Sequence, residues 1–245
     1  MNKIILDRWQ GLGDNLQIST IPRRLYEKYG EKVVYISDAT FYRNPEIREL
    51  VWENNPYIAG FTDQPGESKR SVLQIGRYDW IETWERLYGL SEPFSQKPEV
   101  YIQKQNDLFG VSSSVVFDIS SSEESLKVHL SQFPNYLDTH KKIIQDLYNQ
   151  FKGKNIVKVV NPNLSKAASV DLMSLLCPEL DIKTVEVKTI KDYCNVISNC
   201  NEFVSTHSGN HSLASCLRDS AICIIPKKFF QIKYFVYRNI KYVLV

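Results

Sequence analysis

The sequence has no long hydrophobic run: no stretch approaches the roughly 18 apolar residues that a membrane-spanning helix needs. Its start, MNKIILDRWQ, carries only a short apolar run before Asp7 and Arg8, so it does not look like a signal peptide. These two absences predict a cytoplasmic protein.

A strong excess of charge is lacking as well. The formal net charge is +2 at neutral pH, too mild for the clustered basic face of a nucleic-acid-binding domain, so we expect no nucleic-acid partner. Cysteine is scarce, with five residues, an odd number that includes no C-x-x-C pair. This pattern predicts buried thiols in a reducing compartment and argues against a disulfide framework.

Two common enzyme signatures are missing too. The sequence has no G-x-S-x-G elbow and no G-x-x-x-x-G-K-[ST] loop. The residues that α/β-hydrolase and P-loop chemistry require are therefore not in place.

What the sequence does have is a regular alternation. With 245 residues, 43% of them hydrophobic, the chain can bury a substantial core. Short β-branched runs alternate with longer helical patterns, which is typical of βαβ units and a parallel sheet. Between Glu92 and Gly110 the pattern loosens into prolines, glutamines and lysines, which indicates a linker. We therefore predict an α/β protein with two Rossmann-like domains, residues 1–108 and 109–245, facing each other across a cleft.

The same alternation predicts the individual elements. Strands are expected over residues 3–6, 32–36, 71–75, 115–119, 155–160, 182–187, 202–205, 221–225 and 242–245. Helices are expected over residues 14–28, 45–53, 81–87, 140–151, 170–176, 190–198 and 209–217.

The segment GLGDN, from Gly11 to Asn15, joins the first expected strand to the first expected helix. Glycine at such a corner lets the backbone approach a ligand closely. NAD binding is disfavoured, because Leu16 stands where the dinucleotide fingerprint has its third glycine and because an acid would face the pyrophosphate. Asp14 has two interpretations: a first-turn acid or cap worth about 1 kcal/mol, or a general base aimed into the cleft.

A second corner, THSGN, from Thr206 to Asn210, opens the helix expected over residues 209–217. The N–H groups of a helix amino-terminus can hold a phosphate, although a simple Ser-capped helix would give the same pattern. His207 and His211 have the helical spacing of zinc ligands, but no acidic partner accompanies them. We expect no metal, and we expect both histidines to line the ligand pocket.

These two corners carry a family resemblance. The segment THSGNHSLASCL resembles the D-[ST]-G-x-x-H-L-A pattern of the GT-B glycosyltransferases of bacterial cell-surface synthesis, especially the lipopolysaccharide heptosyltransferases. The segment GLGDNLQISTIPRRLYEKYG resembles the amino-terminal pattern of the same family. The matching positions there are Arg8, Gly13, Asp14, Pro22 and Leu25.

The resemblance implies a glycosyltransferase that moves a sugar from a nucleotide-sugar donor to a cell-surface glycan or lipid-linked acceptor, with inversion. Asp14 falls on the family's catalytic base. The chain departs from the family where His207 replaces an acid and Ser212 replaces a histidine, which puts the sugar specificity in question. No two aspartates stand two positions apart, so we expect neither a metal nor a cofactor besides the donor. The expected donor-binding residues are Gly13, His207, Ser208, Gly209, Asn210 and His211.

A cation should neutralise the departing phosphate, and two loop lysines are the candidates. Lys127 follows the strand that ends in FDIS, and Lys166 follows NPNLS; both are also typical of solvated surface lysines. The serines at 120–122 could donate hydrogen bonds to phosphate or serve as turn residues.

Aromatic side chains leave two further questions open. The rings of Trp9, Trp52, Tyr78, Trp80 and Trp84 suit sugar stacking, but core packing is the more common use of such residues. The tail KKFFQIKYFVYRNIKY mixes lysines with aromatic residues. It fits either a peripheral contact with the inner face of an anionic membrane or a final helix that packs its aromatic stripe across the domain junction.

Two other functions remain open. A noncatalytic relative that binds a nucleotide or glycan would explain the substitutions at His207 and Ser212. A nucleotide-sugar epimerase would use a similar fold without an acceptor.

Overall fold

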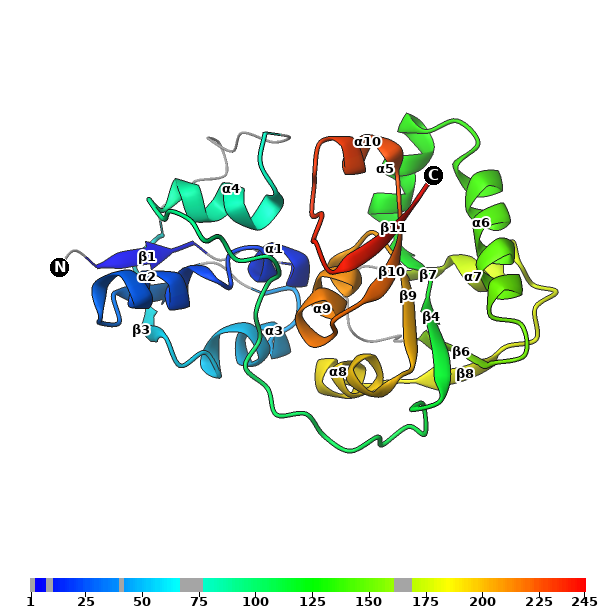
Figure 1. Ribbon diagram of the computed structural model, residues 1–245, viewed down its shortest axis with the longest axis horizontal. Coiled ribbons are helices and arrows are strands. Elements are labelled where there is room, and N and C mark those ends of the chain that lie inside the picture. Colours follow the sequence, from blue (N-terminus) through cyan, green and yellow to red (C-terminus); the bar gives the residue numbers. More distant parts are fainter. Residues whose placement is uncertain (1–2, 8–10, 40–41, 67–76, 161–168) are drawn as a thin grey trace. The chain divides into compact units, whose positions relative to one another are not determined.

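The computed structural model describes residues 3–7, 11–39, 42–66, 77–160 and 169–245 (Figure 1). The chain divides into two compact units. Unit 1 comprises Met1–Gln103 and Lys228–Asn239, and unit 2 comprises Lys104–Lys227 and Ile240–Val245.

Unit 1 contains a parallel sheet. Its described strands are ordered β1 (Ile4–Leu6), β2 (Val34–Ser37) and β3 (Ile58–Thr62). The helices of this unit are α1 (Leu12–Leu16), α2 (Ile21–Tyr29), α3 (Glu46–Arg48), the π-helical turn η1 (Glu49–Glu53) and α4 (Trp80–Leu87). The strand expected over residues 71–75 lies outside the described residues.

The long first helix expected over residues 14–28 is wrong in one respect, because the chain forms two helices there. α1 ends at Leu16, and α2 begins at Ile21 with Pro22 in its first turn. Proline has no N–H and cannot continue an α-helix, but it fits the start of a new one. The apolar spacing itself is confirmed, since Leu16, Ile21 and Leu25 are fully buried.

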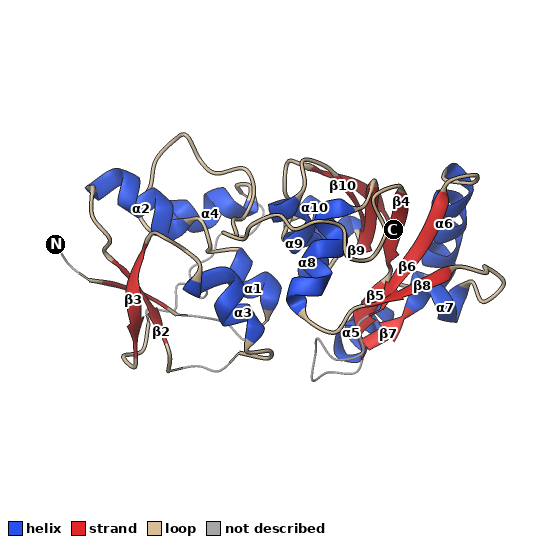
Figure 2. Ribbon diagram, turned by 90° about the horizontal axis from the view of Figure 1, so that it is seen from below, coloured by secondary structure: helices blue, strands red, loops and turns tan. Residues whose placement is uncertain are grey.

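Unit 2 contains a larger parallel sheet with helices on both faces. Its described strands are ordered β11-β10-β9-β4-β6-β8, and every neighbouring pair is parallel. α8 and α9 cover one face, and α6 and α7 cover the other (Figure 2). The strand bounds are β4 (Ser114–Asp118), β6 (Asn155–Val160), β8 (Lys183–Glu186), β9 (Glu202–Thr206), β10 (Ala221–Ile225) and β11 (Ile240–Leu244).

The strand order of unit 2 fixes where a ligand would be expected. The chain starts in the middle of the sheet at β4, moves outward through β6 and β8, and returns to the other side of β4 as β9. The order therefore reverses between β4 and β9. In open α/β sheets, ligands bind at the carboxyl ends of the strands beside this switch point.

The core of unit 2 is apolar, and the unit also contains a small two-stranded antiparallel sheet. Buried residues of β4, β9 and β10 pack with those of α6 and α7, among them Phe117, Ile144 and Val204. Two short strands, β5 (Ser120–Ser122) and β7 (Ser169–Asp171), pair antiparallel. The helices are α5 (Glu123–Gln132), α6 (Tyr136–Gln150), α7 (Leu172–Leu176), α8 (Ile190–Asn199), α9 (Gly209–Leu217) and α10 (Lys227–Gln231).

The expected linker has no helix or strand. Residues 91–113 are irregular, and the division between the two units, at Gln103 and Lys104, falls within them. Ser19 Oγ accepts from the N–H of Glu99 at 2.8 Å, which ties the first part of the segment to unit 1. The amide of Asn195 binds the backbone of Asn106 and Leu108, which ties the second part to unit 2.

The aromatic tail packs on unit 1, but not as the expected final helix. α10 ends at Gln231, and the rings of Tyr234 and Phe235, which follow it, contact Trp80 with centroids 5.0 and 5.1 Å away. Within the described part of the chain, no helix is both long enough and apolar enough to span a membrane.

Candidate functional site

The GLGDN corner of unit 1 begins with a glycine whose absent side chain makes room for a carboxylate. Gly11 is the N-cap of α1, and Asp14 lies in the first turn. A Cβ added to Gly11 would stand 2.8 Å from Asp14 Oδ2, so the carboxylate lies directly against this glycine. Gly13 and Asp14 are both half-buried in this turn.

Two buried amides hold this turn in place. Asn15 accepts from Trp52 Nε1 at 2.8 Å and donates to the carbonyl of Gly11 at 2.8 Å. Gln17 Oε1 accepts from two indoles, Trp80 Nε1 at 2.9 Å and Trp84 Nε1 at 3.0 Å. The polar end of each indole is therefore bound to the segment that carries Asp14.

These contacts decide between the two uses of the tryptophans. Trp52, Trp80 and Trp84 are at most 2% exposed, so they are core residues and not sugar-stacking platforms. Tyr78 is half-buried, and the guanidinium of Arg86 lies 4.4 Å from its ring centre. Arg8 and Trp9 lie outside the described residues.

The THSGN corner of unit 2 forms a capped helix start. Ser208 Oγ accepts from the N–H of Asn210 at 3.2 Å, and the N–H of Ser208 donates to His211 Nδ1 at 3.0 Å. This reciprocal pair is a capping box, which satisfies two of the donors at the start of α9. The imidazole of the half-exposed His207 lies 4.7 Å from that of His211, which is buried.

A buried carboxylate joins this helix start to the end of the neighbouring strand. Asp118, the last residue of β4, accepts from Ser120 Oγ at 2.5 Å and from Asn210 Nδ2 at 2.6 Å. The hydroxyl of Tyr193, on α8, donates to the same carboxylate. Thr206 Oγ1 donates to the carbonyl of Ser120 at 2.5 Å. The cluster therefore lies between β4 and β9, at the switch point of the sheet.

Burial dominates the electrostatics of this cluster. It raises the pKa of Asp118, and the hydrogen bonds from Ser120 and Tyr193 offset only part of the effect. Burial and the neighbouring carboxylate also raise the pKa of Tyr193, so its hydroxyl remains a donor.

Asp118, Tyr193 and Thr206 are the members of this cluster that the sequence-based prediction missed. A signal was present for Asp118, because it is the one charged residue that ends the β-branched run SVVFD. Thr206 begins the THSGN corner, but its bond to Ser120 joins residues far apart in the chain. Tyr193 had no signal of its own, since it reaches the cluster only through the folding of the sheet.

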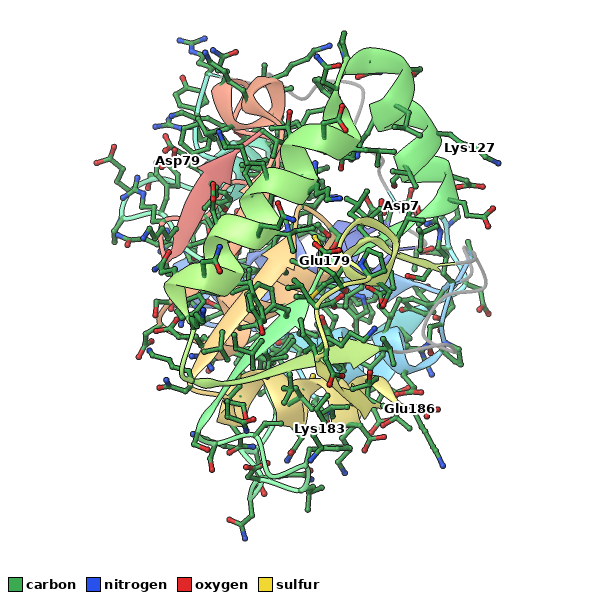
Figure 3. All side chains as sticks on the ribbon, turned by 90° about the vertical axis from the view of Figure 1, so that its right-hand side faces the viewer. Asp7, Asp79, Lys127, Glu179, Lys183 and Glu186 are labelled. Atoms are coloured by element: carbon green, nitrogen blue, oxygen red, sulfur yellow. The ribbon has the colours of Figure 1, made fainter. Side chains whose placement is uncertain are left out.

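The two predicted cations have different outcomes. Lys127 lies on α5, not in a loop, and its side chain is exposed (Figure 3). Lys166 lies outside the described residues. Of the three serines, Ser120 binds Asp118, and Ser122 caps α5 by accepting from the N–H of Ser125 at 3.2 Å.

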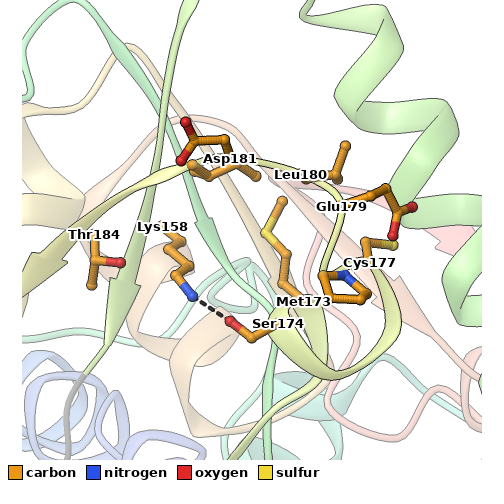
Figure 4. Close-up of a pocket in the computed structure, with 10 residues that line it drawn as sticks. Lys158, Met173, Ser174, Cys177, Glu179, Leu180, Asp181 and Thr184 are labelled. Atoms are coloured by element: carbon orange, nitrogen blue, oxygen red, sulfur yellow. Dashed lines mark hydrogen bonds between the residues drawn. The ribbon is translucent and has the colours of Figure 1, made fainter.

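A pocket of about 400 Å³ lies elsewhere in unit 2, beside β6, α7 and β8 (Figure 4). It contains none of the predicted site residues. Its one lysine, Lys158, is bound to Asp171 at 2.9 Å and to the hydroxyl of Ser174. Burial raises the pKa of Asp171, but the bonds from Ser174 and Lys158 outweigh it and leave that pKa below its ordinary value. The positive charge of Lys158 is thus already paired with Asp171.

None of the five cysteines is in a disulfide. Four of them are buried, which confirms the predicted burial of the thiols. Within the described ranges, no group of three or more His, Cys, Asp or Glu residues is arranged to hold a metal ion.

Solved structures share this fold over nearly the whole chain. A family 9 glycosyl transferase from Veillonella parvula aligns with a TM-score of 0.63 over 100% of this chain and 86% of its own, at 10% identity. The ADP-heptose LPS heptosyltransferase II of E. coli aligns with a TM-score of 0.60 over 98% of this chain and 90% of its own, at 12% identity. The chain has the fold of these glycosyltransferases.

The iron-containing dodecameric glycosyltransferase TibC from enterotoxigenic E. coli has the same fold, with a TM-score of 0.58 at 11% identity, but this chain spans only 58% of it. A scan of protein-family models and a search of curated proteins found no match. The glycosyltransferase likeness confirms the predicted α/β class with parallel sheets.

Proposed function

We propose that the chain is a glycosyltransferase that moves a sugar from a nucleotide-sugar donor to a cell-surface glycan or lipid-linked acceptor. The observation that carries the proposal is the likeness in fold to glycosyltransferases over nearly the full length of this chain and of two of them. The polar cluster at the switch point of unit 2 supports it, because ligands of open α/β sheets bind there.

The proposed reaction is a single displacement. An acceptor hydroxyl attacks the anomeric carbon, its proton goes to Asp14, and the bond to the nucleoside diphosphate breaks with inversion. In this scheme the acceptor binds to unit 1 and the donor binds to unit 2. The proposal therefore includes a cleft between the two Rossmann-like halves, in which acceptor and donor meet.

Positive groups are needed where the diphosphate leaves, and the proposal uses the chain's own groups instead of a metal or cofactor. The N–H groups at the start of α9 face a phosphate oxygen, while Lys127 and Lys166 supply positive charge. Gly13 leaves room for the substrate, and the histidines contact the sugar. The donor-binding residues in this proposal are Gly13, Lys127, Lys166, His207, Ser208, Gly209, Asn210 and His211.

The proposed location is the cytoplasm, at the inner face of the membrane where a lipid-linked acceptor is available. The tail gives this location limited support. Lys233 and Arg238 bind Asp79 at 3.1 and 2.8 Å, so any contact with anionic lipid depends on Lys227, Lys228 and Lys241.

The test compares one substitution at two helix starts. Aspartate is a good N-cap, so Ser208→Asp keeps α9 capped while it places a negative charge at the proposed phosphate site. Thr189→Asp makes the same change at α8, whose capping box has the same form. Binding of ADP, UDP, GDP, CMP and their common sugars is measured by ligand-observed NMR.

We expect selective binding of one nucleotide by the wild type and by Thr189→Asp, and its loss in Ser208→Asp. Binding of none of these compounds by the wild type would overturn the proposal. Equal binding by all three proteins would show that the phosphate does not bind at the start of α9.

A noncatalytic binding relative is the second candidate, and the substitutions at His207 and Ser212 favour it. Chromatography with mass spectrometry of reactions with the selected nucleotide sugar separates the possibilities. Transfer releases free nucleotide and adds a sugar to the acceptor. An epimerase and a binding protein both leave the donor mass unchanged, but only an epimerase produces a second species of that mass with a different retention time.

A further inference from the structure

Asp118 is the buried acid that joins three elements around the switch point. It is 5% exposed, and its three donors come from β5, α8 and α9. An ionised carboxylate only accepts hydrogen bonds, and a buried one is stable only while donors surround it. The positions of Ser120, Tyr193 and Asn210 are therefore fixed relative to one carboxylate.

One of these donors lies in the turn to which the proposed function assigns a phosphate, and another lies in the serine segment that the sequence offers for hydrogen bonds to phosphate. Ser120 belongs to the serine segment after β4, and Asn210 belongs to the first turn of α9. Asn210 Nδ2 and Ser120 Oγ are themselves 3.4 Å apart, so the two segments meet at Asp118. Its third donor, Tyr193, belongs to α8, which contains none of the proposed donor-binding residues.

We infer that Asp118 is a positioning residue for the nucleoside diphosphate: its carboxylate holds the Ser120 segment and the first turn of α9 at the separation that the diphosphate requires. It acts through these two segments and not by touching the donor. This inference rests on the proposed function, and it names the part of the donor that Asp118 serves.

A second contact makes the inference testable. Thr206 Oγ1 binds the carbonyl of Ser120 without involving Asp118. The Ser120 segment thus keeps one attachment to β9 when the carboxylate is changed. We expect a variant at Asp118 to shift the segment within a sheet that remains folded.

The experiment compares Asp118→Asn with Tyr193→Phe. Asparagine keeps the size of the side chain but turns one acceptor into a donor that faces other donors. Tyr193→Phe removes only the donor from α8 and leaves the bonds to Ser120 and Asn210 intact. The dissociation constants of the nucleoside diphosphate that the wild type selects, and of its monophosphate, are measured by calorimetry together with the melting temperature.

We expect both variants to melt at a lower temperature, since each disturbs a buried hydrogen bond. Only Asp118→Asn should weaken diphosphate binding, by roughly 10-fold or more, which is the loss of one hydrogen bond to a charged group. Its effect on the monophosphate should be smaller, because fewer phosphate contacts depend on the separation of the two segments. A general loss of stability would instead weaken the binding of the diphosphate and of the monophosphate equally, and it would do so in both variants.

Several outcomes would overturn the inference. Diphosphate binding by Asp118→Asn that equals that of Tyr193→Phe would show that Asp118 is structural only. If Asp118→Asn does not fold, Ser120→Ala breaks one of the two segment bonds while Asp118 keeps its other donors, and unchanged diphosphate affinity there overturns the inference. A wild type that binds no nucleotide overturns the proposed function instead.

Discussion

At the scale of single residues, a substitution of Asp14 should affect turnover and nucleotide binding differently. Asp14→Asn keeps the shape of the residue and removes its ability to take a proton. Turnover should fall at least ~100-fold, the usual contribution of a positioned base, while nucleotide affinity stays near that of the wild type. Product formation and nucleotide binding are measured on the same preparation. A wild-type rate would make Asp14 only a first-turn acid of α1.

A substitution at Gly11 tests the role of the Asp14 carboxylate without changing Asp14 itself. Its φ of −90° suits any residue, so Gly11→Ala should change the free energy of unfolding by less than about 1 kcal/mol. The added Cβ would nevertheless displace the Asp14 carboxylate, and turnover should fall. Gly30→Ala is the control, because its φ of 75° makes alanine costly there, at a site away from Asp14. We expect that control to lose stability and keep its turnover per folded molecule.

A buried histidine predicts how stability depends on pH. His140 Nδ1 donates to the carbonyl of Tyr136 at 3.0 Å, and its Nε2 finds no hydrogen-bond partner among the described residues. Burial lowers the pKa of His140 from 6.5 to about 4, while the bond to Tyr136 opposes the shift. His140 therefore becomes protonated below about pH 6.5 in the unfolded chain, but only below about pH 4 in the folded chain.

The unfolding free energy should accordingly decrease as the pH falls from 6.5 toward 4, by up to about 3 kcal/mol from this group. Urea denaturation at pH 7 and pH 5 measures the loss. His140→Phe should reduce the difference between the two pH values without abolishing it, because burial also lowers the pKa of His129. If the unfolding free energy changed equally between the two pH values in the wild type and in His140→Phe, His140 would not be a source of the pH dependence.

At the scale of elements, α1 is held by its amides as much as by its apolar face. Gln17→Leu would leave the buried N–H groups of Trp80 and Trp84 without their acceptor. Each unsatisfied group costs about 1–3 kcal/mol, so a loss of about 2–6 kcal/mol is expected in the free energy of unfolding. Gln145→Leu is the matched control, since its amide bond to Glu179 is exposed and should contribute within about 0.5 kcal/mol. Equal costs would contradict this role of Gln17.

The elements that the sequence predicts best are those with one clear periodicity. α9, β6 and β10 have the predicted bounds. β6 and β10 are short runs rich in β-branched residues, and α9 begins at Gly209 in the THSGN corner. The prediction fails where two patterns overlap. The helix expected over residues 170–176 begins only at Leu172, because residues 169–171 pair with β5 and Asp171 caps α7.

Other elements had weak local signals. α5 was missed because Val128 and Leu130 are exposed on it, so its apolar residues do not form a buried face. β3 was missed because it contains Gly60, which weakens a strand pattern. In the candidate site too, only local patterns could be predicted from the sequence. Both glycine corners are visible in the sequence, but the contact between Asp118 and Asn210 joins residues far apart in the chain.

At the scale of the whole molecule, the segment Lys228–Asn239 is the one that leaves unit 2 for unit 1 and then returns to form β11. Asp79 anchors it by ion pairs with Lys233 and Arg238. Burial raises the pKa of Asp79, but the bonds from Arg238 and Lys233 outweigh it and leave the pKa below its ordinary value. The pairs are thus present at neutral pH and are lost as the pH falls through that lowered pKa.

Asp79→Asn should release this segment while changing the global stability little. The carboxylate is 33% exposed, and ion pairs of that kind contribute about 1 kcal/mol or less. Opening of the segment should nevertheless become more frequent, and trypsin should cut after Lys233 and Arg238 several times faster at pH 7, as mass spectrometry of the fragments would show. Asp171→Asn removes the ion pair with Lys158 in unit 2 and serves as the control, with cleavage at these two sites unchanged. Equal acceleration in both variants would mean that global unfolding exposes the segment, and that Asp79 does not anchor it.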